Sequence, residues 1–182
     1  MTLTDVDLQA LAEETVWLAN NPDFRERPAT LVEFLGPDYL NIRENTRDRI
    51  VDVLADIMGH EVSPDRPTAY SRAMFTGGIG IGKTTVASIV LTYLCHWVLC
   101  LNDPEKYFGL LPGSRIAFMM MSTTGGQAKK VLFGDTKARI AGSRWFKNHP
   151  MDPAFRNEIR FPTAGGGGVW ILPGDSADTT LS

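Results

Sequence analysis

The spacing of hydrophobic residues changes near residue 66 and divides the chain into two parts. Before this point, apolar residues recur three or four positions apart, as on one face of a helix, loosely at 5–19 and more regularly at 45–58. After it, short apolar runs typical of strands alternate with longer helical stretches. The expected strands are 69–77, 115–121, 158–161 and 169–172, and the expected helices are 86–101 and 127–140.

This order predicts an α/β protein with a helical N-terminal segment. Strand, helix, strand, helix, strand is the order of a mostly parallel sheet with covering helices. We expect residues 1–66 to form an acidic helical lead-in and residues 67–182 to form the α/β core. A chain of 182 residues is long enough to bury such a core.

Charge is distributed unevenly along the chain. Residues 1–66 carry a net charge of −8, whereas residues 127–160 carry +5. The basic members of the later segment are Lys129, Lys130, Lys137, Arg139, Arg144, Lys147, Arg156 and Arg160. Such a segment is typical of contact with an anionic partner or of a solvated helix face, and charge alone leaves both interpretations open.

The most apolar stretch, Val86 to Leu101, is predicted to be a core helix and not a membrane span. It has sixteen residues, whereas a spanning helix needs about 20. Cys95 and Cys100 lie inside it and are interpreted as small buried hydrophobic residues, which suits a reducing cytoplasm. The acidic N-terminus lacks the basic region of a signal peptide. We therefore expect a cytoplasmic protein without a membrane partner.

A glycine-rich run between the first expected strand and the first helix of the core matches the P-loop pattern G-x-x-x-x-G-K-[ST]. Glycines let a loop turn its N–H groups toward a phosphate, and the following helix N-terminus favours an anion. The predicted nucleotide-binding residues are Gly77, Gly78, Ile79, Gly80, Ile81, Gly82, Lys83, Thr84 and Thr85. Lys83 is the predicted catalytic residue, on the β- and γ-phosphates of ATP, and Thr84 is the predicted Mg²⁺ ligand.

Hydrolysis also needs an acid at the end of a second strand, and the sequence offers no convincing one. The strand at 115–121 ends at Ser122, and Val169 to Leu172 runs into Pro173-Gly174, which predicts a loop before Asp175. We therefore expect a core that is incomplete at its C-terminus, and a chain that by itself turns over ATP weakly or not at all.

The run Tyr107 to Phe146 behind this P-loop resembles the ATPase half of phage large terminase subunits, the motors that pump viral DNA into a procapsid. The similarity rests on the turn and helix start at Ser122, Thr123, Thr124, Gln127 and Ala128 and extends over about 41–182. It implies a P-loop NTPase three-layer sandwich that couples ATP hydrolysis to movement of double-stranded DNA in the bacterial host cytoplasm. It also implies a portal or procapsid, a small terminase subunit and a homo-oligomeric ring as partners.

Three other hypotheses remain open at this point. A helicase-like ATPase would share the chemistry of Lys83 but separate strands. A small-molecule kinase would need a lid of phosphate-binding arginines, for which the sequence offers Arg139, Arg144, Arg156 and Arg160. A chain that binds nucleotide without turnover would need the P-loop alone.

Overall fold

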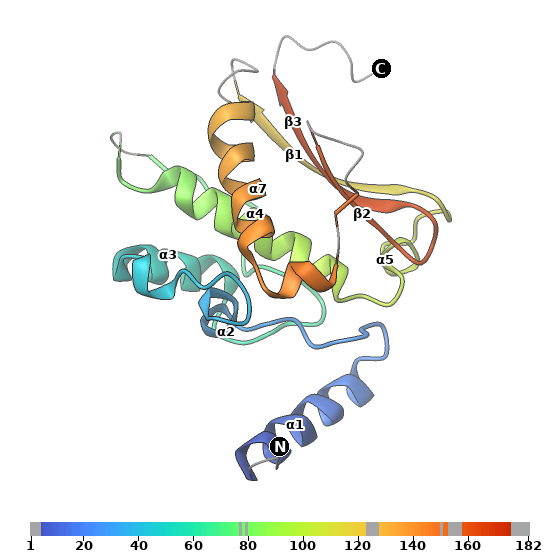
Figure 1. Cartoon of the computed structure of the whole chain (residues 1–182). Coiled ribbons are helices and arrows are strands. Elements are labelled where there is room, and N and C mark those ends of the chain that lie inside the picture. Colours follow the sequence, from blue (N-terminus) through green and yellow to red (C-terminus); the bar gives the residue numbers. More distant parts are fainter. Residues whose placement is uncertain are drawn as a thin grey trace.

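The computed structural model describes residues 5–76, 78, 80–122, 128–149, 151–152 and 158–175 (Figure 1). The N-terminal part contains α1 (Asp5–Asn20), α2 (Leu31–Leu35), the 3-10 turn η1 (Arg43–Asn45) and α3 (Asp48–Met58). The later part contains α4 (Lys83–Leu99), α5 (Pro104–Tyr107), β1 (Arg115–Ser122), η2 (Ala128–Phe133), α7 (Gly134–Gly142), η3 (Trp145–Asn148), β2 (Ile159–Pro162) and β3 (Gly168–Asp175).

The sheet has three strands in the order β1-β3-β2. β1 and β3 are parallel, with Ile116 opposite Val169, whereas β2 and β3 form an antiparallel hairpin. One face is covered by α4, η2 and α7, and Val169 and Ile171 are completely buried beneath them. No described element covers the other face. The α/β class is therefore confirmed, but the predicted three-layer sandwich is not, because the described residues form one helical layer and one mixed sheet.

The strand expected at 69–77 is not formed by its described residues, and that prediction is wrong. Residues 69–76 form no ladder, and Tyr70 and Met74 are 60% and 90% exposed. A strand of a parallel sheet is normally buried on both faces. Residues 69–76 lack this burial and pair with no other strand of the described residues. The segment is fixed near its start, where the Ala69 N–H donates to the Ile57 carbonyl oxygen at 2.7 Å.

β3 runs further than its apolar core predicts. It continues through Pro173 and Gly174 to Asp175, so the loop expected there is wrong. Proline is rare inside strands because it cannot donate a hydrogen bond to a neighbouring strand. The pairing of β2 with β3 stops at Ile171, so Pro173 lies where no β2 residue needs an N–H donor.

The glycines 165–168 form a packed turn between β2 and β3, and not the flexible tip that a run of four glycines suggests. The Glu105 carboxylate accepts hydrogen bonds from the Thr163 hydroxyl and, at 3.1 Å, from the Gly167 N–H. A Cβ atom on Gly167 would lie 1.9 Å from the Ser114 carbonyl oxygen. The glycine at this position therefore permits a close approach of two backbones.

The helices of the lead-in share a hydrophobic core with the P-loop helix. Phe34, Leu54 and Ile57 pack with Ile89 and the neighbouring residues of α4. The second core lies between the far end of α4 and the sheet. α4 thus belongs to both cores, while the boundary at residue 66 stays a prediction.

Candidate nucleotide-binding site

The glycine-rich loop leads directly into α4, which begins at Lys83. Gly82 precedes the helix with φ of 93°, and Gly80 has φ of 86°. Side chains other than glycine rarely adopt this region, so these two glycines allow the loop to turn before the helix starts. The predicted residues Gly78, Gly80, Ile81, Gly82, Lys83, Thr84 and Thr85 line one hollow of about 390 Å³. Gly77 and Ile79 lie outside the described residues.

Lys83 folds back over this loop. Its Nζ donates a hydrogen bond to the Gly78 carbonyl oxygen at 2.9 Å. The ammonium group therefore lies at the mouth of the loop, at the positive end of the α4 dipole. Both features favour a phosphate there, and Thr84 follows in the first turn, where a hydroxyl can ligate Mg²⁺.

α3 supports the loop from below, which sequence reasoning missed. A Cβ atom on Gly82 would lie 2.8 Å from Ile50 Cδ1. Ile50 belongs to α3, whose apolar stripe packs against α4. The helical stripe at 45–58 is visible in the sequence, but no sequence signal says that it touches the P-loop.

The loop faces the same side of the molecule as the carboxyl ends of β1 and β3. In Figure 1, α4 runs from left to right, whereas β1 and β3 run from right to upper left. Ligands of open α/β sheets bind at this carboxyl edge. Ser122 and Asp175 are paired in register at the end of the two strands. The sequence placed Asp175 in a loop, whereas the structure places it at a strand end.

α7 contacts the P-loop helix through a partly buried hydrogen bond. Arg139 Nε donates to Ser88 Oγ at 2.9 Å, and Ser88 itself is fully buried. Ser88 follows Thr84 by four residues, so the two lie on the same face of α4, one turn apart. Burial lowers the pKa of Arg139, and Asp135 opposes this shift.

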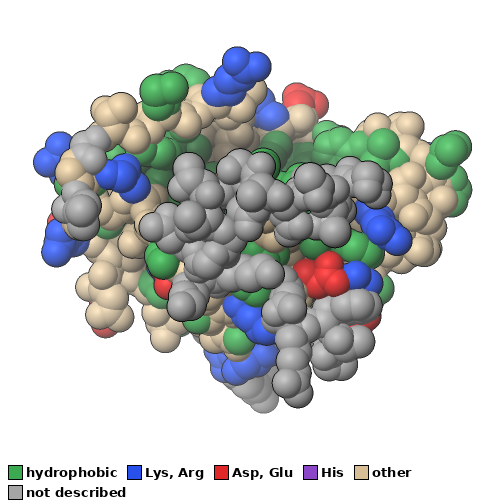
Figure 2. Space-filling model, turned by 90° about the horizontal axis from the view of Figure 1, so that it is seen from above, with side chains coloured by type: hydrophobic (Ala, Val, Ile, Leu, Met, Phe, Trp, Pro, Cys, Tyr) green, Lys and Arg blue, Asp and Glu red, His purple; other side chains and the backbone are tan. Residues whose placement is uncertain are grey.

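Two further arginines of the basic segment, Arg144 and Arg160, pair with acids and do not line the hollow at Lys83. Arg144 pairs with Asp38 at 3.1 Å, and Arg160 pairs with Glu158. In the view from above, Lys and Arg side chains lie at several separate places and not in one patch (Figure 2). The kinase-like lid is therefore not assembled from Arg139, Arg144 and Arg160. Arg156, Thr123, Thr124 and Gln127 lie outside the described residues, as do the side chains of Lys129 and Lys130.

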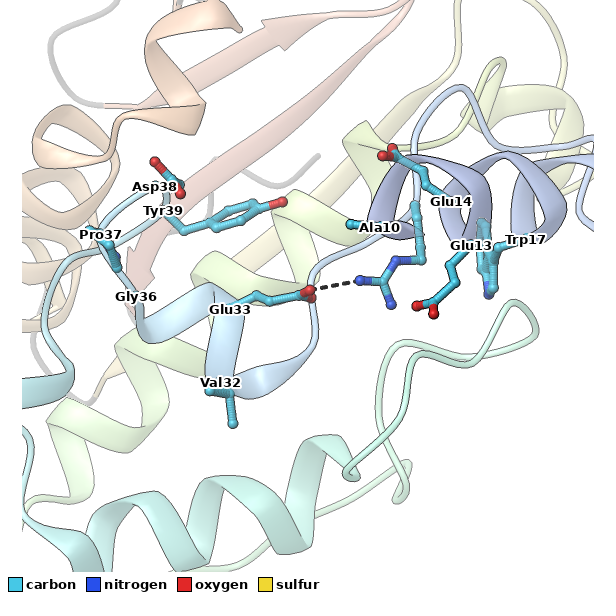
Figure 3. A pocket seen from close by; sticks show the side chains of 11 residues that line it. Ala10, Glu13, Glu14, Trp17, Val32, Glu33, Gly36, Pro37, Asp38 and Tyr39 are labelled. Carbon is cyan, nitrogen blue, oxygen red and sulfur yellow. Dashed lines mark hydrogen bonds and ion pairs between the residues drawn. The ribbon is translucent and has the colours of Figure 1, made fainter. Parts of the chain in front are cut away.

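A larger hollow of about 660 Å³ lies between α1 and α2 (Figure 3). It is lined by Glu13, Glu14, Glu33 and Asp38, and one of these carboxylates, Glu33, pairs with Arg27 at 2.7 Å. Such an acidic lining repels phosphate. The smaller hollow at Lys83 is therefore the better nucleotide site.

His96 and Cys95 of α4, and Cys100 directly after the helix, are completely buried. Burial lowers the pKa of His96 to about 3, so it is neutral, and its Nε2 accepts the Ala29 N–H at 2.9 Å. Burial raises the pKa values of the Cys95 and Cys100 thiols, so both are poor nucleophiles. The described residues contain no group of His, Cys, Asp and Glu that could hold a metal. Within the same residues, no helix is long and apolar enough to cross a membrane.

A lysine at a helix start, glycines at positive φ and a hollow at the carboxyl edge of a sheet define a P-loop domain. The chain matches the family described as "Uncharacterized protein MJ0330, N-terminal P-loop domain" over residues 6–163, and it belongs to that family. No curated protein and no solved structure matches the chain. The family match supports nucleotide binding and spans residue 66, so it includes the lead-in helices.

Proposed function

We propose that this P-loop domain binds Mg²⁺-ATP and works as the ATPase part of a DNA-packaging motor of the large terminase class. Lys83 holds the β- and γ-phosphates, and Thr84 ligates Mg²⁺. When bound, Mg²⁺ neutralises charge that develops on the transferred phosphoryl group. The partners of this proposal are double-stranded DNA, a portal or procapsid, a small subunit and further copies in a ring.

One observation carries the ATP-binding part. The Lys83 Nζ already lies within the loop, 2.9 Å from the Gly78 carbonyl oxygen, beside an open hollow. A phosphate entering the hollow meets a cation, loop N–H groups and a helix N-terminus together. This combination is more specific than the motif alone.

The motor part is supported by the resemblance of Tyr107 to Phe146 and by the packing of this run. It includes β1 and α7, and α7 contacts the P-loop helix through Arg139 and Ser88. The same run carries much of the basic segment, and a motor needs ionic, sequence-independent contacts with DNA. A helix that touches both DNA and the P-loop helix would couple the two ligands.

Binding of a fluorescent ATP analogue to residues 1–182 tests the first part, with Lys83→Ala as the variant and Lys137→Ala as the matched control. Loss of a charge-assisted contact worth about 1.5–3 kcal/mol weakens binding by about 10- to 100-fold. The control retains wild-type affinity. Equal binding by Lys83→Ala and wild type would contradict the site.

Duplex DNA tests the motor part. We expect DNA binding that weakens steeply with salt and shifts the affinity for ATP, because linked ligands change each other's affinity by the same factor. ATP turnover, with and without duplex DNA, tests the proposal of weak activity in this chain. ATP binding without any response to DNA would favour a nucleotide-binding chain of another kind, and separation of DNA strands would favour a helicase-like protein.

A further inference from the structure

The first turn of α3 lies against the P-loop. A Cβ atom on Gly82 would lie 2.8 Å from Ile50 Cδ1, and Gly82 directly precedes α4. Further along both helices, Leu54 of α3 shares a hydrophobic core with Val86 and Ile89 of α4. The two helices therefore run side by side in the same direction, and both begin next to the glycine-rich loop (Figure 1).

The apolar stripe of α3 leads to an arginine at its N-terminal end. Residues three or seven positions apart lie on the same face of a helix. Arg47 precedes Ile50 by three residues and Leu54 by seven, so it stands at the start of the stripe that packs on α4. At 1.5 Å per residue, it lies about 4.5 Å before Ile50 along the helix axis. Because Ile50 is level with Gly82, this step carries Arg47 past the beginning of α4, to the level of the loop.

The fold makes no use of the Arg47 side chain. Arg47 is exposed and occupies the N-cap position of α3 without a capping hydrogen bond. Within the described part of the chain, its guanidinium group has neither a hydrogen-bond partner nor an ion pair. Arg43, in contrast, pairs with Asp48 at 3.0 Å. The side chain of Arg47 can therefore turn toward the hollow without breaking a contact.

An arginine at this position costs the helix stability. Ser, Thr, Asp and Asn are the preferred N-cap residues, since their side chains accept from the first N–H groups of the helix. A cation there also faces the positive end of the helix dipole. A residue that breaks such a local rule without a structural gain is expected at a functional site. The missing partner of Arg47 is therefore an anion.

The charges next to the loop suit an anion with several negative charges. Arg47, Lys83 and the N-termini of α3 and α4 bring positive charge to the same side of the molecule. A guanidinium group offers a planar pair of donors that matches two phosphate oxygens, whereas the ammonium group of Lys83 acts as a point charge. The two cations thus contact a phosphate chain in different ways.

We propose that Arg47 is a further nucleotide-binding residue, which contacts the phosphate chain of the ATP held at Lys83. This inference rests on the proposed ATP site and extends it to the lead-in segment. A bound nucleotide bridges the beginnings of α3 and α4, so the lead-in takes part in binding as well as in packing.

Titration of residues 1–182 with a fluorescent ATP analogue tests the proposal. Arg47→Ser removes the guanidinium group, and we expect about tenfold weaker binding from the loss of a charge-assisted contact. Arg49→Ser is the matched control, because it removes the same charge from an exposed position two residues further on, which lies on the opposite face of α3. This control is expected to retain wild-type affinity.

Two further measurements separate a phosphate contact from a structural role. Serine is a preferred N-cap, so urea denaturation should show that Arg47→Ser is as stable as the wild type or more stable. An arginine needed only for the fold would instead lose stability. Displacement of the analogue by inorganic tripolyphosphate isolates the phosphate contact, and Arg47→Ser should weaken tripolyphosphate binding by the same factor as ATP binding. Arg47→Gln replaces Arg47→Ser if circular dichroism shows that the serine variant does not fold.

Wild-type affinity of Arg47→Ser, an equal loss in Arg49→Ser, or unchanged tripolyphosphate binding would each overturn the role of Arg47. Lys83→Ala distinguishes this failure from a failure of the ATP site. A loss of binding in Lys83→Ala alone keeps the ATP site and removes only the contribution of α3. Wild-type affinity in both Lys83→Ala and Arg47→Ser overturns both proposals.

Discussion

The two ends of α4 are built differently. At the first turn, Gly82, Lys83 and Thr84 border an open hollow and remain partly exposed. At the last two turns, every residue from Cys95 to Leu99 is buried. The first end keeps the space and backbone freedom that a phosphate needs, and the second supplies the packing. Changes at the second end should therefore alter stability, and changes at the first should alter binding.

The largest effect is expected at the buried end. Trp97 is 1% exposed, and its indole N–H donates to the Ser63 carbonyl oxygen at 3.1 Å. Trp97→Ala leaves a cavity and an unpaired acceptor, which lowers the free energy of unfolding by about 3–5 kcal/mol. Urea denaturation measures this change, with Trp97→Phe as a milder control. The folded fraction of Trp97→Ala should bind ATP as tightly as the wild type. Weaker binding by this fraction would contradict the division of α4 into a binding end and a packing end.

Lowering the pH should destabilise the same buried end of α4, where His96 lies. The pKa of His96 is lowered by burial to about 3, below its value of 6.5 in the unfolded chain. The unfolded chain therefore binds the proton first, and stability is lost as the pH falls from about 6.5 toward 3. We expect a loss of about 1 kcal/mol per pH unit in urea denaturation between pH 6 and 4.5. A stability that His96→Gln leaves equally dependent on pH would contradict this assignment.

A smaller loss of stability with a clear loss of binding is expected at the loop. Gly82→Ala places a Cβ at φ of 93° and 2.8 Å from Ile50 Cδ1. The strained backbone costs about 1–2 kcal/mol, and we expect at least tenfold weaker ATP binding. The double variant Gly82→Ala/Ile50→Ala separates the two causes. If Ile50→Ala restored full affinity, the side-chain clash and not the backbone would be responsible.

The smallest effect is expected between the ends, where Ser88 Oγ accepts from Arg139. Ser88→Ala removes this acceptor and should cost about 1 kcal/mol of stability. A double-mutant cycle with Arg139→Met measures the coupling by urea denaturation. Additive effects of the two changes would show that the contact contributes nothing.

The P-loop was recognisable in the sequence because its pattern is local, and the family match supports a P-loop domain, while the role of each residue in nucleotide binding stays a prediction. A loop that turns toward a phosphate needs glycines and a lysine at fixed spacing. In the structure, one hollow is lined by Gly78, Gly80, Ile81, Gly82, Lys83, Thr84 and Thr85. The α4 helix is confirmed for a similar reason, since the apolar run from Val86 to Leu101 is local to one stretch of the chain, although the helix begins at Lys83 and ends at Leu99.

The structural features that the sequence analysis predicted wrongly or missed depend on contacts between residues that are distant in the sequence. Residues 69–76 have the composition of a strand, but a strand needs a neighbour, and composition does not show whether one is present. Pro173 and Gly174 suggest a break, yet β3 passes through them because β2 has already ended. The support of Gly82 by Ile50 joins residues 32 positions apart. None of these contacts has a sequence signal.

The membership of α4 in both hydrophobic cores has a consequence for exchange of its amide hydrogens. A helix held by one core can open with that core, whereas α4 contributes Ile89 and Tyr93 to one core and Cys95 and Trp97 to the other. The middle of α4 is therefore released only when both cores separate. Its amides should be among the slowest to exchange in the chain, and their protection should equal the global free energy of unfolding. Slow exchange in α4 would thus show that the lead-in helices and the α/β core unfold as one cooperative unit.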